Sequence, residues 1–402
     1  MLPMEQRTKF VMEVEEAECS FAALCRAYGI SRRTGYKWWG RFRAEGLEGL
    51  RERSRAPRRR PNQSACCWTQ RAIALRERYP FWGPKKIRTR LLARFGRKEK
   101  MVVPAVSTLG AMLCRAGLVR SRRRRRHGVA LAQVPRSALR RAEVPNEVWA
   151  ADFKGWFRTL DGKRCDPLTV SDLASRYLLC AEILSSQSVA QTQKAFRRLF
   201  ARSGLPEVMR VDNGGPFGSR GAGGLSRLSV WWMRLGIKVE FIAPGHPEQN
   251  GSHERMHRTL KEQTTRPPAR SVRKQQVRFD QWRRHFNLHR PHEALAQQVP
   301  ARCYEACSRR YPSELQEVQY PSGWLMRRVR SNGQIKWAGR LYFIGEALVG
   351  QLVGLKRVGS GRHEIYFMER LLGSLDEASA NFDGLRPTAY ARQNSRKGEQ
   401  KV

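Results

Sequence analysis

A change in residue patterning near position 148 constrains the fold of this 402-residue chain more than any other feature. Before it, apolar residues recur at the i, i+3, i+4 spacing of amphipathic helices, as Phe21, Leu24 and Cys25 do. After it, runs of residues typical of buried strands begin, the first over 148–157. A chain of this length is expected to form two or three domains. We therefore predict a multidomain α/β protein whose N-terminal part is helical.

The charge balance limits the function classes. The chain has 77 Lys and Arg against 35 Asp and Glu, a formal net charge of +42. This excess indicates a polyanionic partner, nucleic acid first and an anionic membrane surface second, and the predicted partner is double-stranded DNA. No apolar run reaches the ~18 residues of a spanning helix, and no signal-peptide core is present, so we expect no membrane partner. Nine cysteines without a framework spacing indicate reduced thiols and a cytoplasmic protein.

Residues 1–50 are predicted to form a helix-turn-helix DNA-binding domain, with helices over 6–16, 20–28 and 32–43. Gly29 suits the turn because it tolerates a left-handed backbone, and Ser31 suits the N-cap of the third helix. Such a recognition helix contacts bases and phosphates from its first turns. The alternative is a three-helix protein-interaction module, but the charge favours DNA. The predicted contact residues are Arg32, Arg33, Tyr36 and Lys37.

A second helix-turn-helix-like domain is predicted over 64–119, with Thr69 capping its first helix. The linker that follows, 120–145, has six arginines within residues 120–126 and cannot form a core. Its arginines are predicted to clamp DNA phosphates, each adding ~0.9 to the salt dependence of binding. The alternative is a solvated linker, which is compatible with that role. The arginines at its centre are Arg122, Arg123 and Arg124.

Three carboxylates are candidates for catalysis and metal binding. Asp152 lies within the strand predicted over 148–157, and Asp212 follows the strand predicted over 208–211. Glu254 begins a helix predicted over 252–263, after the turn residues of 245–251. A mixed sheet with flanking helices can bring these three points together. Oxygen ligands suit Mg²⁺ or Mn²⁺, and two such ions can clamp the attacking and leaving oxygens of a phosphoryl transfer.

On the helix that begins at Glu254, a 3.6-residue period places basic groups beside the carboxylate. His257, Arg258 and Lys261 share its face, whereas Met256 and Leu260 lie opposite and form an apolar seam. This pattern indicates a metal ligand facing a polyanion. A solvated charged face is the alternative.

Other residues compete with these three carboxylates, and another chemistry fits part of the same segment. His253 and His257 match the H-E-x-x-H zinc-protease pattern, with Glu254 as the base, but neighbouring arginines oppose a zinc site. Glu248 is a rival third acid, and His246 is either a turn residue or a DNA contact. Asp166 and Asp172 are the remaining rivals for the acid roles, and Asp172 suits a hairpin better.

The chain resembles insertion-sequence transposases of the retroviral-integrase superfamily, which carry a DDE catalytic core on an RNase H-like fold. The matching segments are 149–153, 211–214, 245–251, 254–261 and 287–295. The resemblance implies a core over 146–300 in which Asp152 bridges two metal ions. Asp212 then holds one ion and Glu254 the other.

The same resemblance implies the reaction and the partners. The enzyme would nick the ends of its element and use the freed 3′-hydroxyl to attack target DNA, with no covalent protein–DNA intermediate. Arg258 and Lys261 would touch the end of the element. A homo-oligomer on paired ends in the bacterial nucleoid is expected. The alternative function is a non-catalytic DNA-binding regulator or a decayed transposase copy.

Two departures from the family pattern affect the expected structure. Forty-one residues separate Asp212 from Glu254, more than is usual, and we predict that the surplus forms a mobile loop over 217–225. The zinc-binding head of retroviral integrases is absent. Short strands over 321–378 predict a small C-terminal SH3-like β-barrel, either for DNA binding or for oligomerisation. The tail, 385–402, is predicted to be disordered.

Overall fold

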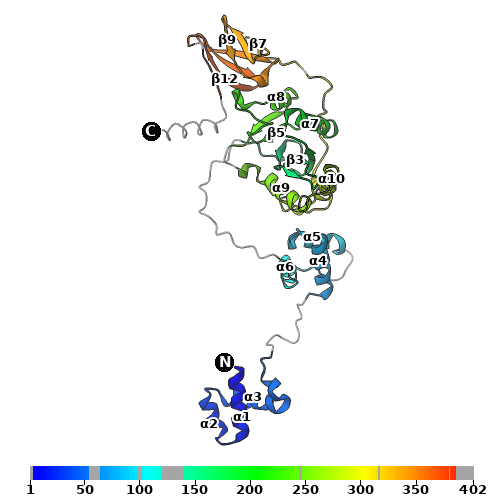
Figure 1. Cartoon of the computed structure of the whole chain (residues 1–402), viewed down its shortest axis with the longest axis vertical. Coiled ribbons are helices and arrows are strands. Elements are labelled where there is room, and N and C mark those ends of the chain that lie inside the picture. The colour runs from blue at the N-terminus through cyan, green and yellow to red at the C-terminus, as the bar shows by residue number, and fades with distance from the viewer. Residues whose placement is uncertain are drawn as a thin grey trace. The chain divides into compact units, whose positions relative to one another are not determined.

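The computed structural model describes residues 3–53, 64–96, 102–119, 139–243, 247–315, 317–379 and 381–385. The chain divides into two compact units, Met1–Cys66 and Cys67–Val402 (Figure 1). No helix in the described part of the chain has the length and apolar character that a membrane span requires.

The N-terminal unit is a helix-turn-helix with its own apolar core. Ser20 and Ser31 each accept a backbone N–H bond at a helix start, as N-caps do, and Gly29 takes a positive φ of 63° in the turn. Phe10 and Trp38 are buried between the helices. The elements are α1 (Met4–Glu16), α2 (Phe21–Ala27), α3 (Arg32–Glu45) and the 3₁₀ helix η1 (Gly46–Leu50).

Three helices follow in the second unit. Trp68, Ile87 and Leu109 are buried among them. The prediction that Thr69 caps the first of these helices is wrong, because the helix already begins three residues earlier, at Cys66. The helices are α4 (Cys66–Arg78), α5 (Pro84–Phe95) and α6 (Val106–Arg115).

A six-stranded mixed sheet forms the centre of the second unit. The strand order is β2-β3-β1-β5-β6, with β4 paired to β3. β1 runs parallel to β5 and antiparallel to β3. The predicted strand over 148–157 ends at Phe153, and Gly155, with a φ of 67°, precedes a separate short strand. The strands are β1 (Val148–Phe153), β2 (Phe157–Arg158), β3 (Arg164–Asp172), β4 (Leu178–Leu184), β5 (Val208–Val211) and β6 (Lys238–Phe241).

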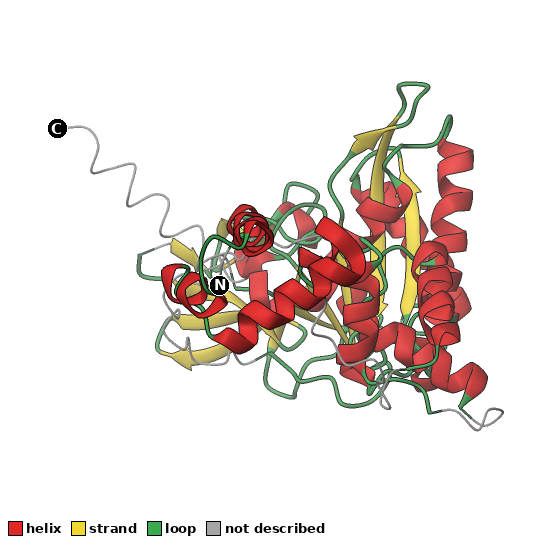
Figure 2. Ribbon diagram, turned by 90° about the horizontal axis from the view of Figure 1, so that it is seen from below, coloured by secondary structure: helices red, strands yellow, loops and turns green. Residues whose placement is uncertain are grey.

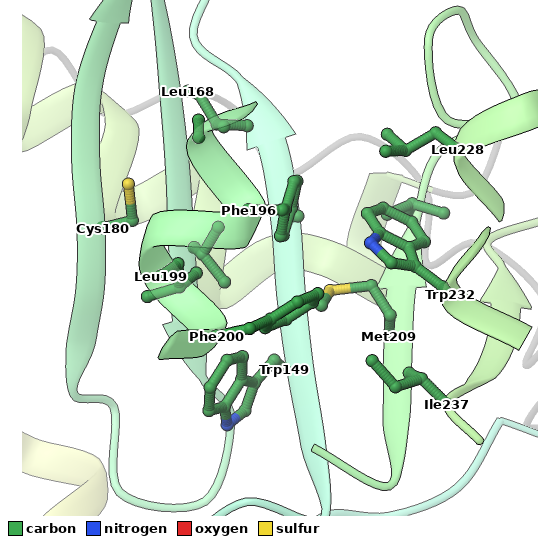
Figure 3. Packing of buried hydrophobic residues seen from close by; sticks show 14 of the residues in the cluster. Trp149, Leu168, Cys180, Phe196, Leu199, Phe200, Met209, Leu228, Trp232 and Ile237 are labelled. Carbon is green, nitrogen blue, oxygen red and sulfur yellow. The ribbon is translucent and has the colours of Figure 1, made fainter. Parts of the chain in front are cut away.

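Helices cover both faces of this sheet, in the RNase H-like arrangement that the resemblance implies (Figure 2). On one face, Phe196 and Phe200 of α7 pack toward Met209 and Trp232 (Figure 3). On the other, α9 and α10 cover β4 with an apolar cluster that includes Met256 and Leu260. The helices are α7 (Val189–Ser203), η2 (Ala222–Gly224), α8 (Arg227–Arg234), η3 (Pro247–Asn250), α9 (Gly251–Thr264), α10 (Val272–Leu288), η4 (Glu293–Leu295) and α11 (Pro300–Cys303).

The C-terminal region is rich in strands, as predicted. Its described strands form a five-stranded antiparallel sheet, β13-β12-β11-β10-β7, and a two-stranded sheet, β8-β9. Closure into a barrel stays a prediction. The sequence did not indicate β12 or β13. The elements are β7 (Leu325–Arg328), β8 (Gln334–Trp337), β9 (Arg340–Phe343), η5 (Glu346–Leu348), β10 (Leu352–Gly359), β11 (Arg362–Phe367), β12 (Arg370–Asp376) and β13 (Asn381–Gly384).

The surplus segment 217–225 packs at both of its ends, with Arg220 and Gly221 exposed between them. Phe217 and Leu225 are each 1% exposed. The Gly223 N–H donates to the Leu385 carbonyl at 2.7 Å, and Arg370 Nε donates to the Gly223 carbonyl at 2.8 Å. The extra residues therefore connect the mixed sheet to the C-terminal strands.

Candidate active site

The parallel pairing of β1 with β5 brings two of the three predicted acids to the same level of the sheet. Val148 pairs with Val208 and Ala150 with Arg210, and the same register continued by two residues sets Asp152 level with Asp212. The third acid, Glu254, lies in the first turn of α9, which covers this face. Strand register and helix packing thus bring together carboxylates that are far apart in the sequence.

A cleft of about 490 Å³ opens beside Asp152. Glu254, Arg258 and Lys261 line it from α9, as the helical period predicted. Sequence reasoning missed Lys154 and Arg266, although the position of Lys154 two residues beyond Asp152 on the same chain segment was a usable signal. The lining residues are Asp152, Phe153, Lys154, Gly155, Glu254, His257, Arg258, Lys261, Glu262 and Arg266.

The pKa of Asp152 reflects its burial first and the neighbouring acids second. Burial raises the pKa of Asp152 to about 7, with a further increase from the charge of Asp212 and a smaller one from Glu254. A hydrogen bond from the Phe153 backbone and the Lys154 charge oppose this rise. Burial also raises the pKa of Asp212. The carboxyl groups of Asp152 and Asp212 are therefore harder to ionise than exposed carboxyl groups.

The donor set fits a divalent cation in its chemistry, although no ready-made cage exists. Asp212 Oδ1 is buried and has no hydrogen-bond partner among the described atoms. An orphaned carboxylate oxygen beside a second acid suits a hard cation such as Mg²⁺ or Mn²⁺. Across the described ranges, no three His, Cys, Asp or Glu side chains lie close enough to hold one ion. The carboxyl groups would have to draw together around it.

The two histidines of the zinc-protease pattern are engaged elsewhere. His253 and His257 are 1% and 4% exposed, and both face Thr169 of β3. Burial lowers the pKa of His253 to about 3 and that of His257 well below its usual value, so both imidazoles are neutral at pH 7. His257 lines the same cleft as Glu254, as the helical period predicted, but from a buried position.

The rival acids have other partners or fall outside the described side chains. Asp166 pairs with Arg164, at 2.7 Å. Asp172 accepts hydrogen bonds from the backbone N–H groups of Asn146 and Ser175, which makes it a turn residue. The side chain of Glu248 and all of His246 lie outside the described part of the chain.

The predicted DNA contacts of α3 are solvent-exposed and lie on its first two turns, where a recognition helix presents them. Tyr36 is 60% exposed, and its ring stacks on Phe21 at 4.2 Å. Arg258 and Lys261 are exposed at the cleft. The linker arginines Arg122, Arg123 and Arg124 lie outside the described residues. The other three contacts on α3 are Arg32, Arg33 and Lys37.

Comparison with known families agrees with this organisation. Integrase core domains match residues 142–247 and 235–300. A helix-turn-helix domain matches residues 6–58, and a homeodomain-like domain matches residues 34–113. The fold and these matches define a chain with an integrase core preceded by helix-turn-helix domains.

Two of the similar curated proteins come from insertion elements. The chain is 30% identical to the insertion element IS407 uncharacterized 31.7 kDa protein of Burkholderia multivorans, over 46% of this chain and 64% of that protein. It is 29% identical to the insertion element IS476 uncharacterized 39.2 kDa protein of Xanthomonas euvesicatoria, over 46% and 50%. The matches thus span half to just under two thirds of these relatives. The chain thus carries an integrase core domain and is similar to proteins of insertion elements.

Similar solved structures come from retroviruses. The HTLV-2 integrase catalytic core domain in complex with magnesium is 15% identical, with a TM-score of 0.33 over 41% of this chain and 100% of that one. The simian T-cell lymphotropic virus intasome in complex with PP2A regulatory subunit B56 gamma is 15% identical, with a TM-score of 0.36 over 75% and 97%. Both likenesses are weak.

Proposed function

We propose that this chain is a DDE transposase that nicks the ends of its element and joins the freed 3′-hydroxyl to target DNA. The observation that carries the proposal is the cleft beside Asp152, which Glu254 also lines and at which Asp212 acts electrostatically. Arg258 and Lys261 on its rim supply positive charge where a DNA phosphate would approach.

In this proposal, Asp152, Asp212 and Glu254 hold two Mg²⁺ or Mn²⁺ ions. When bound, such ions supply Lewis-acid stabilisation of the phosphoryl oxygens in transfer. The chain's own residues bind and orient the DNA. Arg258 and Lys261 would hold the phosphates of the element end, and bound ions would offset the mutual repulsion of the three acids. Burial of Asp152 limits water around it and strengthens these charge interactions.

In this proposal, each part of the chain outside the cleft has its own role on the DNA. The domain over 1–50 reads the terminal repeats through Arg32, Arg33, Tyr36 and Lys37, and the domain over 64–119 extends that site. The linker over 120–145 clamps phosphates. The catalytic core covers 146–300. The strands over 321–378 close into an SH3-like barrel that supports a homo-oligomer on paired ends at the nucleoid.

The test is a strand-transfer assay with purified full-length protein, Mg²⁺ and element-end DNA. Wild type is expected to join ends to target DNA, and Asp212→Asn to lose the joining while retaining DNA binding. Asp161→Asn, an exposed hairpin acid, is the matched control and should join like wild type. Equal joining by wild type and Asp212→Asn would remove the catalytic role. Binding without joining by wild type would favour the non-catalytic regulator or decayed copy.

A further inference from the structure

A chain of buried polar side chains leads from β3 to Asp152. It comprises Ser171, His253, Thr169 and His257, in that order, and these side chains are between 0% and 8% exposed. Elsewhere along its length, α9 faces the sheet with apolar residues, among them Met256 and Leu260. Polar groups in such a place destabilise the fold unless each is hydrogen-bonded. Their presence beside a candidate catalytic acid indicates that they serve a function there.

The contacts are continuous. Ser171 Oγ lies 3.0 Å from His253 Nδ1, and His253 Nε2 lies 2.7 Å from Thr169 Oγ1. Thr169 Oγ1 lies 2.5 Å from His257 Nε2. At the end of the chain, His257 Nδ1 lies 3.5 Å from Asp152 Oδ2. Both imidazoles therefore have polar partners at each of their two nitrogens.

The Thr169 hydroxyl has a single proton and can donate only one hydrogen bond. The acceptor that it chooses determines which group donates at the other links of the chain. Thr169 Oγ1 also lies 3.2 Å from the Asp152 carbonyl oxygen, so it can donate either there or to an imidazole. Donation to the carbonyl would require His257 to carry its proton on Nε2. The bare Nδ1 lone pair would then face the Asp152 carboxylate, which is repulsive when that carboxylate is ionised.

The opposite order satisfies the four contacts along the chain and leaves the 3.2 Å contact with the Asp152 carbonyl without a proton. Thr169 donates to His257 Nε2, the shortest of its contacts, and His257 turns its Nδ1–H toward Asp152. His253 donates its Nε2–H to Thr169 and accepts at Nδ1 from the Ser171 hydroxyl. Each link then has one proton, and each imidazole has one defined tautomer.

We propose that His257 is a positioning residue that orients the Asp152 carboxylate, with its tautomer set by the Ser171–His253–Thr169 chain. At 3.5 Å its N–H restrains the rotation of the carboxylate rather than forming a short bond to it. Groups that orient a metal-binding carboxylate act in this way. The meaning of that orientation for catalysis rests on the proposed function, whereas the tautomers do not.

The first test reads the tautomers directly. Nitrogen-15 NMR of the full chain labelled at histidine is expected to show His257 protonated on Nδ1 and His253 protonated on Nε2. Each signal is assigned by its loss in His253→Asn or His257→Asn. Thr169→Val removes the hydroxyl and should move the His257 proton to Nε2 or mix the tautomers. A wild-type His257 protonated on Nε2 would overturn the proposal, whatever the protein's activity.

The second test separates orientation from packing. His257→Leu removes the N–H, whereas His257→Asn keeps an amide N–H close to the place of Nδ1. The leucine variant is expected to weaken Mn²⁺ binding by about 10- to 100-fold, as loss of a supporting hydrogen bond does, and to slow joining at saturating Mg²⁺. The asparagine variant should recover most of both. His289→Leu, at the exposed end of α10, is the control and should match wild type.

The outcomes distinguish this inference from the proposed function. A purely structural role would lower the thermal midpoint of both His257 variants without changing the Mn²⁺ affinity of the folded protein, and that result would overturn the inference. Wild type that binds Mn²⁺ and shows the expected tautomers but joins no DNA would refute the proposed function alone. If wild type binds no Mn²⁺, the histidine tautomers measured by NMR alone decide whether the inference holds.

Discussion

Asp152 differs from an exposed carboxylate in both its burial and its neighbouring charges. Burial raises its pKa to about 7, with a further increase from Asp212 and a smaller one from Glu254. A folded-state pKa above the unfolded value means that the group stabilises the fold at low pH, where it is protonated in both states. That stabilisation is lost as pH rises from about 4 to about 7. A bound cation would reverse this loss by favouring the ionised form.

We expect Asp152→Asn to stabilise the metal-free protein at pH 8, because it removes a buried charge. The gain is at most about 4 kcal/mol, since each pKa unit corresponds to ~1.4 kcal/mol. Thermal midpoints measured from pH 4 to pH 8 should show a difference between variant and wild type that grows up to pH 7 and then levels. Asp161→Asn, whose pKa is lowered by a hydrogen bond from Thr159, should give no such gain. A midpoint at pH 8 no higher than that of wild type would contradict the expectation.

Arg258 and Lys261 offer a prediction about DNA phosphates. Replacing either by Ala should reduce the slope of log affinity against log salt concentration by about 0.9, because one phosphate contact and its released counterion are lost. Fluorescence anisotropy with duplex DNA at several salt concentrations measures this slope. Arg284→Ala removes an equally exposed charge on α10 that does not line the cleft, and it should leave the slope unchanged. Equal slopes for all three variants and wild type would place the DNA elsewhere.

At the scale of helices and strands, local signals predicted much of what formed. Ser31 caps its helix through a side-chain hydrogen bond, as predicted, and Ser188 and Ser271 cap α7 and α10 in the same way. Helix α9 begins at Gly251, one residue earlier than predicted, directly after a 3₁₀ turn. Strand β12, with sequence RLLGSLD, lacks the β-branched residues that mark strands and is held by its neighbours.

In the candidate site as well, local features could be predicted from the sequence, whereas contacts made by tertiary packing could not. The acids were predictable because a strand interior, a strand end and a helix start are local features. The contact of His253 with Thr169 was not, because it joins residues 84 positions apart through the packing of α9 on β3. A histidine pair at i, i+4 reads equally well as metal ligands, and only tertiary packing decides between these uses.

The segment 217–225 gives an element-scale prediction. Gly223 has a φ of 66°, and a Cβ there would lie 3.1 Å from Leu372 Cδ2. Gly223→Ala is therefore expected to destabilise the C-terminal strands by about 1 kcal/mol or more, since Ala disfavours positive φ. Hydrogen exchange of β12 and β13 amides measures the effect. Gly359→Ala in β10 has no positive φ and only a 3.9 Å contact, so it should be nearly neutral. Unchanged protection in Gly223→Ala would show that this segment does not anchor the strands.

At the scale of the whole molecule, each of the two units has its own hydrophobic core. The N-terminal unit has its own core around Phe10 and Trp38, and Arg7 within it donates to the Leu50 carbonyl. The core of the mixed sheet is built entirely from residues of the second unit. The helix proposed to read DNA and the cleft beside Asp152 therefore lie in parts of the chain that have independent cores.

This independence predicts that damage to one core leaves the other intact. Trp38→Ala removes a large buried side chain, which costs about 3–5 kcal/mol and exceeds what a domain of about 50 residues can lose. We expect residues 3–53 to become sensitive to protease and the full chain to lose its preference for element ends over random DNA. The thermal transition of 67–402, followed in the same protein, should not move. Lys9→Ala, on the exposed side of α1, is the control and should change neither property. A Trp38→Ala variant that lowers the transition of the second unit would show that the two cores fold cooperatively, against the division drawn from their separate packing.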